Sequence, residues 1–173
     1  IEREKKALKP TELGKVVSDL MVQFFNKIFD VKFTAGLEVK LDKIGVEYTE
    51  KYGESSIVAT IGEREGFTLA IRADMDALPI REEADVPFAS ENGCMHACAH
   101  DIHAASLLGA AKILKAHEDE LDGTVKLLFQ SGEEVFHGAE TAISEGILQN
   151  PPVQAAFAMH MFSFVPFGTI SYH

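Results

Sequence analysis

The chain has 173 residues, of which 46% are hydrophobic and 25% are charged, and its formal net charge is −11. This length suits one globular domain with a hydrophobic core of its own. The acidic balance argues against nucleic-acid binding, which needs a basic patch, and against docking on an anionic membrane surface.

The first half of the chain predicts two helices followed by two strands. Hydrophobic residues recur at helical spacing over residues 11–29, and a second helix is expected over residues 35–44, ending at the glycine that follows. Ser56–Ile61 and Phe67–Ala73 have the composition of strands. Because the segment between them begins and ends with glycine, we expect these two strands to form a β-hairpin. Residues 74–90 contain two prolines and predict a loop.

The second half alternates helices with short apolar strands. A helix is expected over Ile102–His117, with Asp101 capping its start. The other expected elements are a strand over Thr124–Gln130, a helix over Ala139–Leu148, and strands over Ala155–Met161 and Gly168–Tyr172. This alternation predicts an α/β layer fold, in which ligand sites gather at strand ends.

A dense group of metal donors lies between Cys94 and His103. It contains both cysteines of the chain and three of its seven histidines. Cys98 and His100 are two residues apart, so an extended segment can turn thiolate and imidazole the same way, toward one transition metal. For an isolated pair, a buried thiol beside a hydrogen-bonded histidine would be the better interpretation; the density of donors favours a metal.

The remaining donors of this group cannot all join a single site. We expect Cys94 and His96 to have structural or supporting roles. His103 lies one helical turn beyond His100 and either orients that histidine or forms hydrogen bonds elsewhere.

Two carboxylates follow the strand that ends at Gln130. A bend at Gly132 would let Glu133 and Glu134 face one site, where they could serve as metal ligand and as base for a metal-bound water. The alternative is an acidic first turn of a helix, where the dipole favours glutamate.

Polar residues also occur within or after two other strands. His160 lies in an apolar run and is either a metal ligand or a hydrogen-bonded core histidine. Asp74 and Asp76 follow a strand and either orient a ligand histidine or cap a loop. Convergence of these strand ends would bring all of these groups into one site.

Three segments resemble motifs of the dinuclear-metal amidohydrolases, a group that includes aminoacylases, hippurate hydrolases and auxin-conjugate hydrolases. Residues 72–80 (RADMDALPI) are similar to the motif RADMDALP, residues 93–103 (GCMHACAHDIH) to GxMHACGHDxH, and residues 129–134 (FQSGEE) to FQPAEE. The resemblance extends from about Thr68 to the end of the chain.

This resemblance implies a catalytic domain with a central mixed sheet flanked by helices. It also implies two divalent ions, zinc or else manganese, cobalt or nickel, held by Cys98, His100, Glu134 and His160, with Cys98 bridging the ions. Glu133 would be the general base. Asp76 would match the aspartate that orients a ligand, and Asp74 and His103 remain the further supporting residues that their own positions suggest.

The implied activity is hydrolysis of the amide bond in small N-acyl amino acids or related conjugates, by a homodimer. A cytoplasmic location is expected separately, because the N-terminus does not resemble a secretory signal and the two cysteines make a poor disulfide framework. Members of the group are considerably longer than this chain, so residues 1–173 would be the N-terminal part of the catalytic domain, without the lid domain and the C-terminal part, and inactive alone.

The sequence departs from the group at several places. Ala99 replaces a glycine between two expected ligands, Ser131-Gly132 replaces Pro-Ala, and an expected motif near Phe29 is missing. Two alternatives stay open. The cysteine and histidine cluster could hold a single structural zinc, and Ala99 and the short length would suit a degenerate partner subunit.

Overall fold

The computed structural model describes residues 36–53, 55–62 and 64–172. Five strands form one sheet in the order β1-β2-β4-β3-β5. The strands are β1 (Tyr48–Thr49), β2 (Ile57–Ile61), β3 (Phe67–Asp74), β4 (Gly123–Gln130) and β5 (Ala155–Ala158). The helices are α2 (His100–Ala116), α3 (Gly138–Ser144), a 3-10 turn (Glu118–Glu120) and a helix over residues 36–44. The expected helix over residues 11–29 lies outside the described residues.

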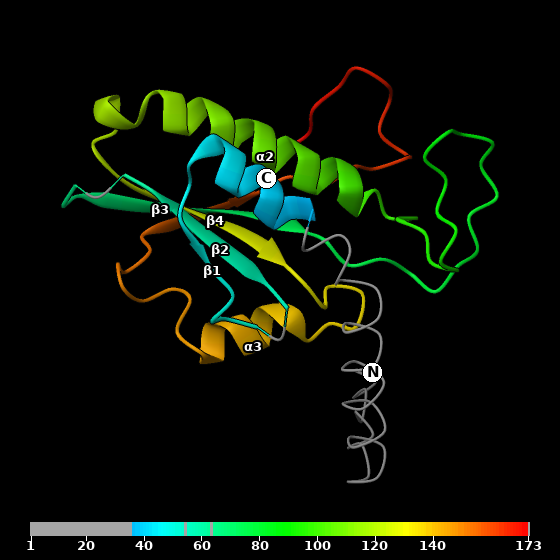
Figure 1. Cartoon of the computed structure of the whole chain (residues 1–173), viewed down its shortest axis with the longest axis horizontal. Helices are drawn as coiled ribbons and strands as arrows, with labels where there is room; N and C mark the ends of the chain where they lie inside the picture. Colours follow the sequence, from blue (N-terminus) through cyan, green and yellow to red (C-terminus); the bar gives the residue numbers. More distant parts are fainter. Residues whose placement is uncertain (1–35, 54, 63, 173) are drawn as a thin grey trace, which may run out of the picture.

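Helices cover both faces of the sheet, as Figure 1 shows. The helix over residues 36–44 and helix α2 pack on one face, and α3 lies against the other. The central strand β4 is buried along nearly its whole length because it has neighbours on both edges and helices on both faces. This explains why its sequence is a continuous apolar run. The predicted mixed sheet flanked by helices is confirmed.

The direction of the strands brings the polar residues together. Strands β4 and β5 both run parallel to β3, so their carboxyl ends meet at one edge of the sheet. Helix α2 connects β3 to β4 and runs back along the sheet, which places its first turn at the same edge. Ligand sites of α/β sheets lie at such an edge.

The predicted hairpin is wrong, although both of its strands exist. Strand β4 lies between β2 and β3 and pairs antiparallel with the first and parallel with the second. The end of β2 and the start of β3 therefore lie two strand spacings apart, about 10 Å, on either side of β4. A Cβ atom on Gly62 would lie 2.5 Å from the carbonyl oxygen of Gly123, which requires glycine at this crossing.

Several predicted boundaries also shift. Helix α2 begins at His100, and its N-cap is Ala99, with no side chain capping it; the Asp101 carboxylate accepts a hydrogen bond from the backbone N–H of Ile102. Helix α3 ends at Ser144, short of Leu148. Strand β5 ends at Ala158, so His160 lies beyond it.

Residues 168–172 form no strand, because no described strand lies beside them. None of the helices within the described residues is long and apolar enough to cross a lipid bilayer.

Candidate metal centre

His100 is the centre of the site. Its side chain is fully buried at the start of α2, and its Nδ1 atom donates a hydrogen bond of 2.8 Å to the backbone oxygen of Asp76. Because a carbonyl oxygen only accepts, Nδ1 carries a proton and the Nε2 lone pair of the neutral ring is available. Nε2 has no hydrogen-bond partner among the described residues.

Three carboxylates surround this nitrogen at a similar distance. His100 Nε2 lies 3.7 Å from Asp74 Oδ2, 3.8 Å from Glu133 Oε2 and 3.8 Å from Glu134 Oε1. These distances are too long for hydrogen bonds. They suit donor atoms arranged around a common ion, since metal–ligand bonds of about 2 Å place neighbouring ligands farther apart than hydrogen-bonded atoms.

Asp76 connects two of the segments that form the site. Its Oδ2 atom accepts a hydrogen bond of 2.9 Å from the backbone N–H of Glu134, and its Oδ1 atom lies 3.5 Å from His100 Nδ1. Burial opposes ionisation of Asp76, but the hydrogen bonds from His100 and Glu134 prevail and lower its pKa. Burial likewise opposes protonation of His100, but its hydrogen bond to Asp76 and the charge of Asp74 prevail and raise its pKa.

Cys98, His100 and Glu134 form one candidate cation site. One ligand atom from each of the three lies within 4.8 Å of the other two. Glu134 Oε1 is buried without a hydrogen-bond partner in the described part of the chain. Burial and the neighbouring Glu134 carboxylate raise the pKa of the Cys98 thiol, and a bound divalent cation would reverse this effect.

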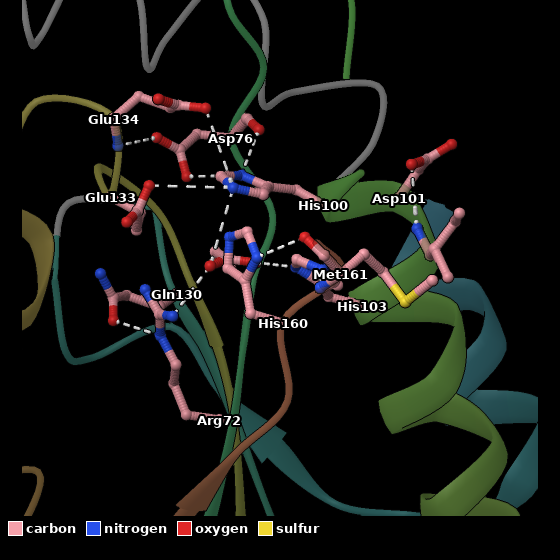
Figure 2. A network of polar contacts seen from close by, with 12 residues as sticks. Arg72, Asp76, His100, Asp101, His103, Gln130, Glu133, Glu134, His160 and Met161 are labelled. Atoms are coloured by element: carbon pink, nitrogen blue, oxygen red, sulfur yellow. Dashed lines mark hydrogen bonds and ion pairs between the residues drawn. The ribbon is translucent and has the colours of Figure 1, made fainter. Parts of the chain in front are cut away.

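A second group shares His100 with the first. Asp74, His100, His103 and His160 also bring one donor atom each within 4.8 Å of one another. The rings of His103 and His160 have centroids 4.6 Å apart, and those of His100 and His160 are 6.1 Å apart (Figure 2). The site residues from the carboxyl ends of β3 and β4, from α2 and from the segment after β5 therefore meet in three dimensions.

Much of the second group is already hydrogen-bonded. Asp74 Oδ1 accepts from His103 Nδ1 at 2.5 Å, and Asp74 Oδ2 accepts from Arg72 Nη1 at 2.8 Å. His103 Nε2 accepts a hydrogen bond of 2.9 Å from the backbone N–H of Met161. His160 Nδ1 donates to the Met161 oxygen at 2.8 Å. Both nitrogens of His103 are thus engaged, whereas His160 keeps Nε2 for another partner.

The donor set fits a divalent metal. Buried nitrogen and oxygen atoms without partners are costly, and an ion between them would satisfy both His100 Nε2 and Glu134 Oε1. Thiolate, imidazole and carboxylate are the ligands that zinc takes in proteins. Other first-row divalent ions accept the same donors.

Two backbone bends aim these side chains. Ala99, between Cys98 and His100, has φ 63°, and Gly132, just before the two glutamates, has φ 74°. Both values lie in the left-handed region. Gly132 is the bend that the sequence suggested, and it lets Glu133 and Glu134 approach the same histidine.

Sequence reasoning missed Arg72 and Gln130. Arg72 donates to Asp74 and also, through Nε, to Gln130 Oε1 at 2.8 Å. Its signal was its place two residues before Asp74 on one face of a strand. Cys94 and His96 belong to neither candidate group; Cys94 is buried, which raises its pKa, and burial lowers the pKa of half-buried His96.

Comparison with known proteins decides the family. The sequence profile of Peptidase family M20/M25/M40 matches residues 70–173. The chain belongs to this family. The match covers every residue placed in the candidate metal centre, from Arg72 to Met161.

Individual members of the M20 family are clearly similar to the chain. IAA-amino acid hydrolase ILR1-like 5 of Arabidopsis thaliana is 41% identical over 143 residues, covering 82% of this chain and 32% of the relative. N-acetylcysteine deacetylase of Bacillus subtilis is 45% identical over 119 residues, covering 68% of this chain and 31% of the relative. The chain thus spans about a third of the length of these curated relatives.

A solved structure agrees with the fold. The Bacillus subtilis YxeP protein, described as a dinuclear metal binding peptidase from the M20 family, superposes with a TM-score of 0.73 at 34% identity. The alignment covers 90% of this chain and 46% of that protein. The family comparison and the donor set together support a metal site in this chain.

Proposed function

We propose that this protein is a metal-dependent hydrolase that cleaves the amide bond of small N-acyl amino acids or related conjugates. The observation that carries the proposal is His100 Nε2, a buried nitrogen without a hydrogen-bond partner among the described residues and surrounded by carboxylates. The relatives named as an IAA-amino acid hydrolase and an N-acetylcysteine deacetylase support the substrate class.

In this proposal, Cys98, His100, Glu134 and His160 would hold two divalent ions. Two groups of donor atoms that share His100 support this ligand set. The bridging role of Cys98 rests on the resemblance to the amidohydrolases. Bound ions of this kind act as Lewis acids that polarise the scissile carbonyl and lower the pKa of water. Zinc is the ion we favour, because thiolate and imidazole both suit it.

Glu133 is the proposed general base. Its carboxylate faces His100 at 3.8 Å and is partly exposed, so substrate and water can reach it. It would take a proton from the attacking water and later give it to the departing amine, which balances the hydrolysis of an amide to a carboxylic acid and an amine. Glu134, whose backbone N–H is fixed by Asp76, would remain a ligand.

We further propose that the described sheet is the N-terminal part of a catalytic domain in a cytoplasmic homodimer. The match to about a third of the length of the curated relatives supports the view that this sheet is part of a longer protein, and its N-terminal position rests on the resemblance to the amidohydrolases. Reduced cysteines support a reducing compartment. The dimer rests on the resemblance to the amidohydrolases.

The test compares two neighbouring glutamates in the whole protein, with N-acetyl and N-benzoyl amino acids as substrates. Glu133→Gln should lower kcat by about 100-fold or more and leave the metal content unchanged. Glu134→Gln should lower the metal content itself. Wild-type rates in Glu133→Gln would remove the proposed base. A single tightly held ion and no hydrolysis would favour a structural zinc module instead.

A further inference from the structure

The second donor group contains a hydrogen-bonded chain that leads to His160. Arg72 Nη1 donates to Asp74 Oδ2, His103 Nδ1 donates to Asp74 Oδ1, and the Met161 N–H donates to His103 Nε2. The side chains of Asp74 and His103 are both fully buried. Figure 2 shows His103 and Met161 beside His160, on the side away from Glu133 and Glu134.

Each hydrogen bond in this chain fixes the next. The Asp74 carboxylate can only accept, so it selects the His103 tautomer with the proton on Nδ1. Nε2 then carries a lone pair, which accepts the Met161 N–H. The other side of residue 161 is also occupied, because its oxygen accepts the Nδ1 proton of His160.

These contacts leave His103 with no ring nitrogen that is free to bind a metal, and each Asp74 oxygen already accepts one hydrogen bond. Both Asp74 oxygens and both His103 nitrogens have partners. Arg72 also gives Asp74 a positive neighbour, which holds its Oδ2 atom 3.7 Å from His100 Nε2. Asp74, His100, His103 and His160 lie close together, but this closeness does not make all four of them metal ligands.

We propose that Asp74 and His103 are positioning residues that fix the Met161 peptide and thereby aim His160 at the metal centre. His103 acts on His160 through the backbone, although it lies one helical turn from His100. Arg72 and Gln130 fix the other end of this series of hydrogen bonds, since Arg72 donates to Gln130 and to Asp74. This inference rests on the proposed function insofar as His160 is a ligand.

The first test uses the unmodified whole protein. With ¹⁵N-labelled histidine and bound ¹¹³Cd²⁺, we expect one-bond cadmium–nitrogen coupling at His100 and His160 and none at His103, whose Nδ1 keeps its proton. Coupling at His103 would overturn the inference while leaving a metal centre in place. Absence of coupling at all three histidines would overturn the proposed metal centre, and the inference with it.

The second test distinguishes the roles of the two ring nitrogens of His103 by replacing the residue with either glutamine or asparagine. His103→Gln places its amide near the position of Nε2 and keeps an acceptor for the Met161 N–H. His103→Asn reaches only the position of Nδ1 and loses that acceptor. We expect His103→Asn to weaken binding of one Cd²⁺ by about 10- to 100-fold, and His103→Gln to weaken it much less.

Equal losses in the two amide variants, or no loss in either, would contradict the positioning role. Unfolding midpoints of the metal-free variants should be similar, which shows that the difference arises at the metal. If His103→Asn does not fold, the cadmium–nitrogen coupling in the unmodified protein decides the question alone.

Discussion

The Oδ2 atom of Asp76 accepts a hydrogen bond of 2.9 Å from the backbone N–H of Glu134. The backbone oxygen of Asp76 accepts a second hydrogen bond, of 2.8 Å, from His100. One residue thus sets the spacing between a histidine at the start of α2 and a glutamate in the turn after β4. Removing the charge of Asp76 should weaken the turn but leave the backbone contact to His100 intact.

Asp76→Asn tests this relationship through acid stability. Hydrogen bonds from His100 and Glu134 outweigh burial and lower the pKa of Asp76, so the folded protein keeps the charge to lower pH than the unfolded chain. Asp76 then contributes stability that is present above about pH 4 and is lost as the pH falls through its folded pKa.

We expect Asp76→Asn to lower the free energy of unfolding by about 1–3 kcal/mol at pH 7, since a hydrogen bond to a charged group is lost. The difference in the free energy of unfolding between the two proteins should become smaller below pH 4. Urea denaturation of both proteins in chelator, from pH 7 to pH 3, measures it. A gap that stays constant over this range would contradict the explanation.

In the metal-free protein, the contribution of His100 to stability should have the opposite pH dependence. Hydrogen bonding to Asp76 and the charge of Asp74 outweigh burial and raise its pKa above 6.5. Its contribution to stability is therefore fully present below pH 6.5 and is lost as the pH rises through the folded pKa.

Zinc should remove this loss of stability at higher pH, because an ion takes the place of the proton on Nε2. We expect the Tm in chelator to fall between pH 6 and pH 9, whereas the zinc-loaded protein stays level or gains stability over that range. Thermal unfolding followed by circular dichroism gives both curves. Parallel curves with and without zinc would show that His100 does not bind the ion.

Local patterns in the sequence predicted the strands but not their neighbours. The expected strand over residues 124–130 differs from β4 by only one residue. The agreement is close because polar and glycine residues clearly bound this buried apolar run. The hairpin failed because a short glycine-bounded connection predicts pairing only if no other strand intervenes. Insertion of β4 depends on contacts some sixty residues away in the sequence, which no local pattern contains.

In the candidate site, too, local patterns were predicted and long-range contacts were not. The sequence placed Asp74, Glu133 and His160 after strands, and the parallel arrangement of β3, β4 and β5 brings them to one edge. It could not show that His103 contacts Met161, because that contact requires β5 to lie beside β3. The contact of Arg72 with Gln130 was hidden in a similar way, because it requires β4 to lie beside β3.

Ala99 predicts a stabilising substitution inside the metal-binding loop. Its φ of 63° is a conformation that costs an L-residue about 1–2 kcal/mol, and glycine adopts it freely. The dinuclear-metal amidohydrolase motif that this segment resembles has glycine here. Ala99→Gly should therefore raise the free energy of unfolding by about 1 kcal/mol without weakening metal binding.

Ala97→Gly is the matched control for Ala99→Gly. The substitution is the same and lies in the same loop, but Ala97 is not among the residues with positive φ. Glycine there should add only flexibility to the unfolded chain and give no gain. Chemical denaturation of both variants distinguishes them, and equal effects would show that the backbone of Ala99 is not strained.

Ser56, the residue just before β2, supports the glutamate-bearing turn. The backbone N–H of Ser131 donates to Ser56 Oγ at 3.1 Å, the two hydroxyl oxygens lie 3.3 Å apart, and both residues are buried. Ser131 immediately precedes the bend at Gly132, so this contact anchors the first residue of the turn. Ser56→Ala would leave the Ser131 N–H without this acceptor in a buried position.

We expect Ser56→Ala to lower the free energy of unfolding by about 1–3 kcal/mol and to weaken metal binding, since Glu134 follows the same bend. Ser55→Ala, a half-buried neighbour, is the control and should change both quantities little. Denaturant titration and competition with a chelator measure the two effects. If the two variants were equally stable and bound metal equally well, the Ser56–Ser131 contact would have no part in holding the turn, and the bend at Gly132 would place the glutamates unaided.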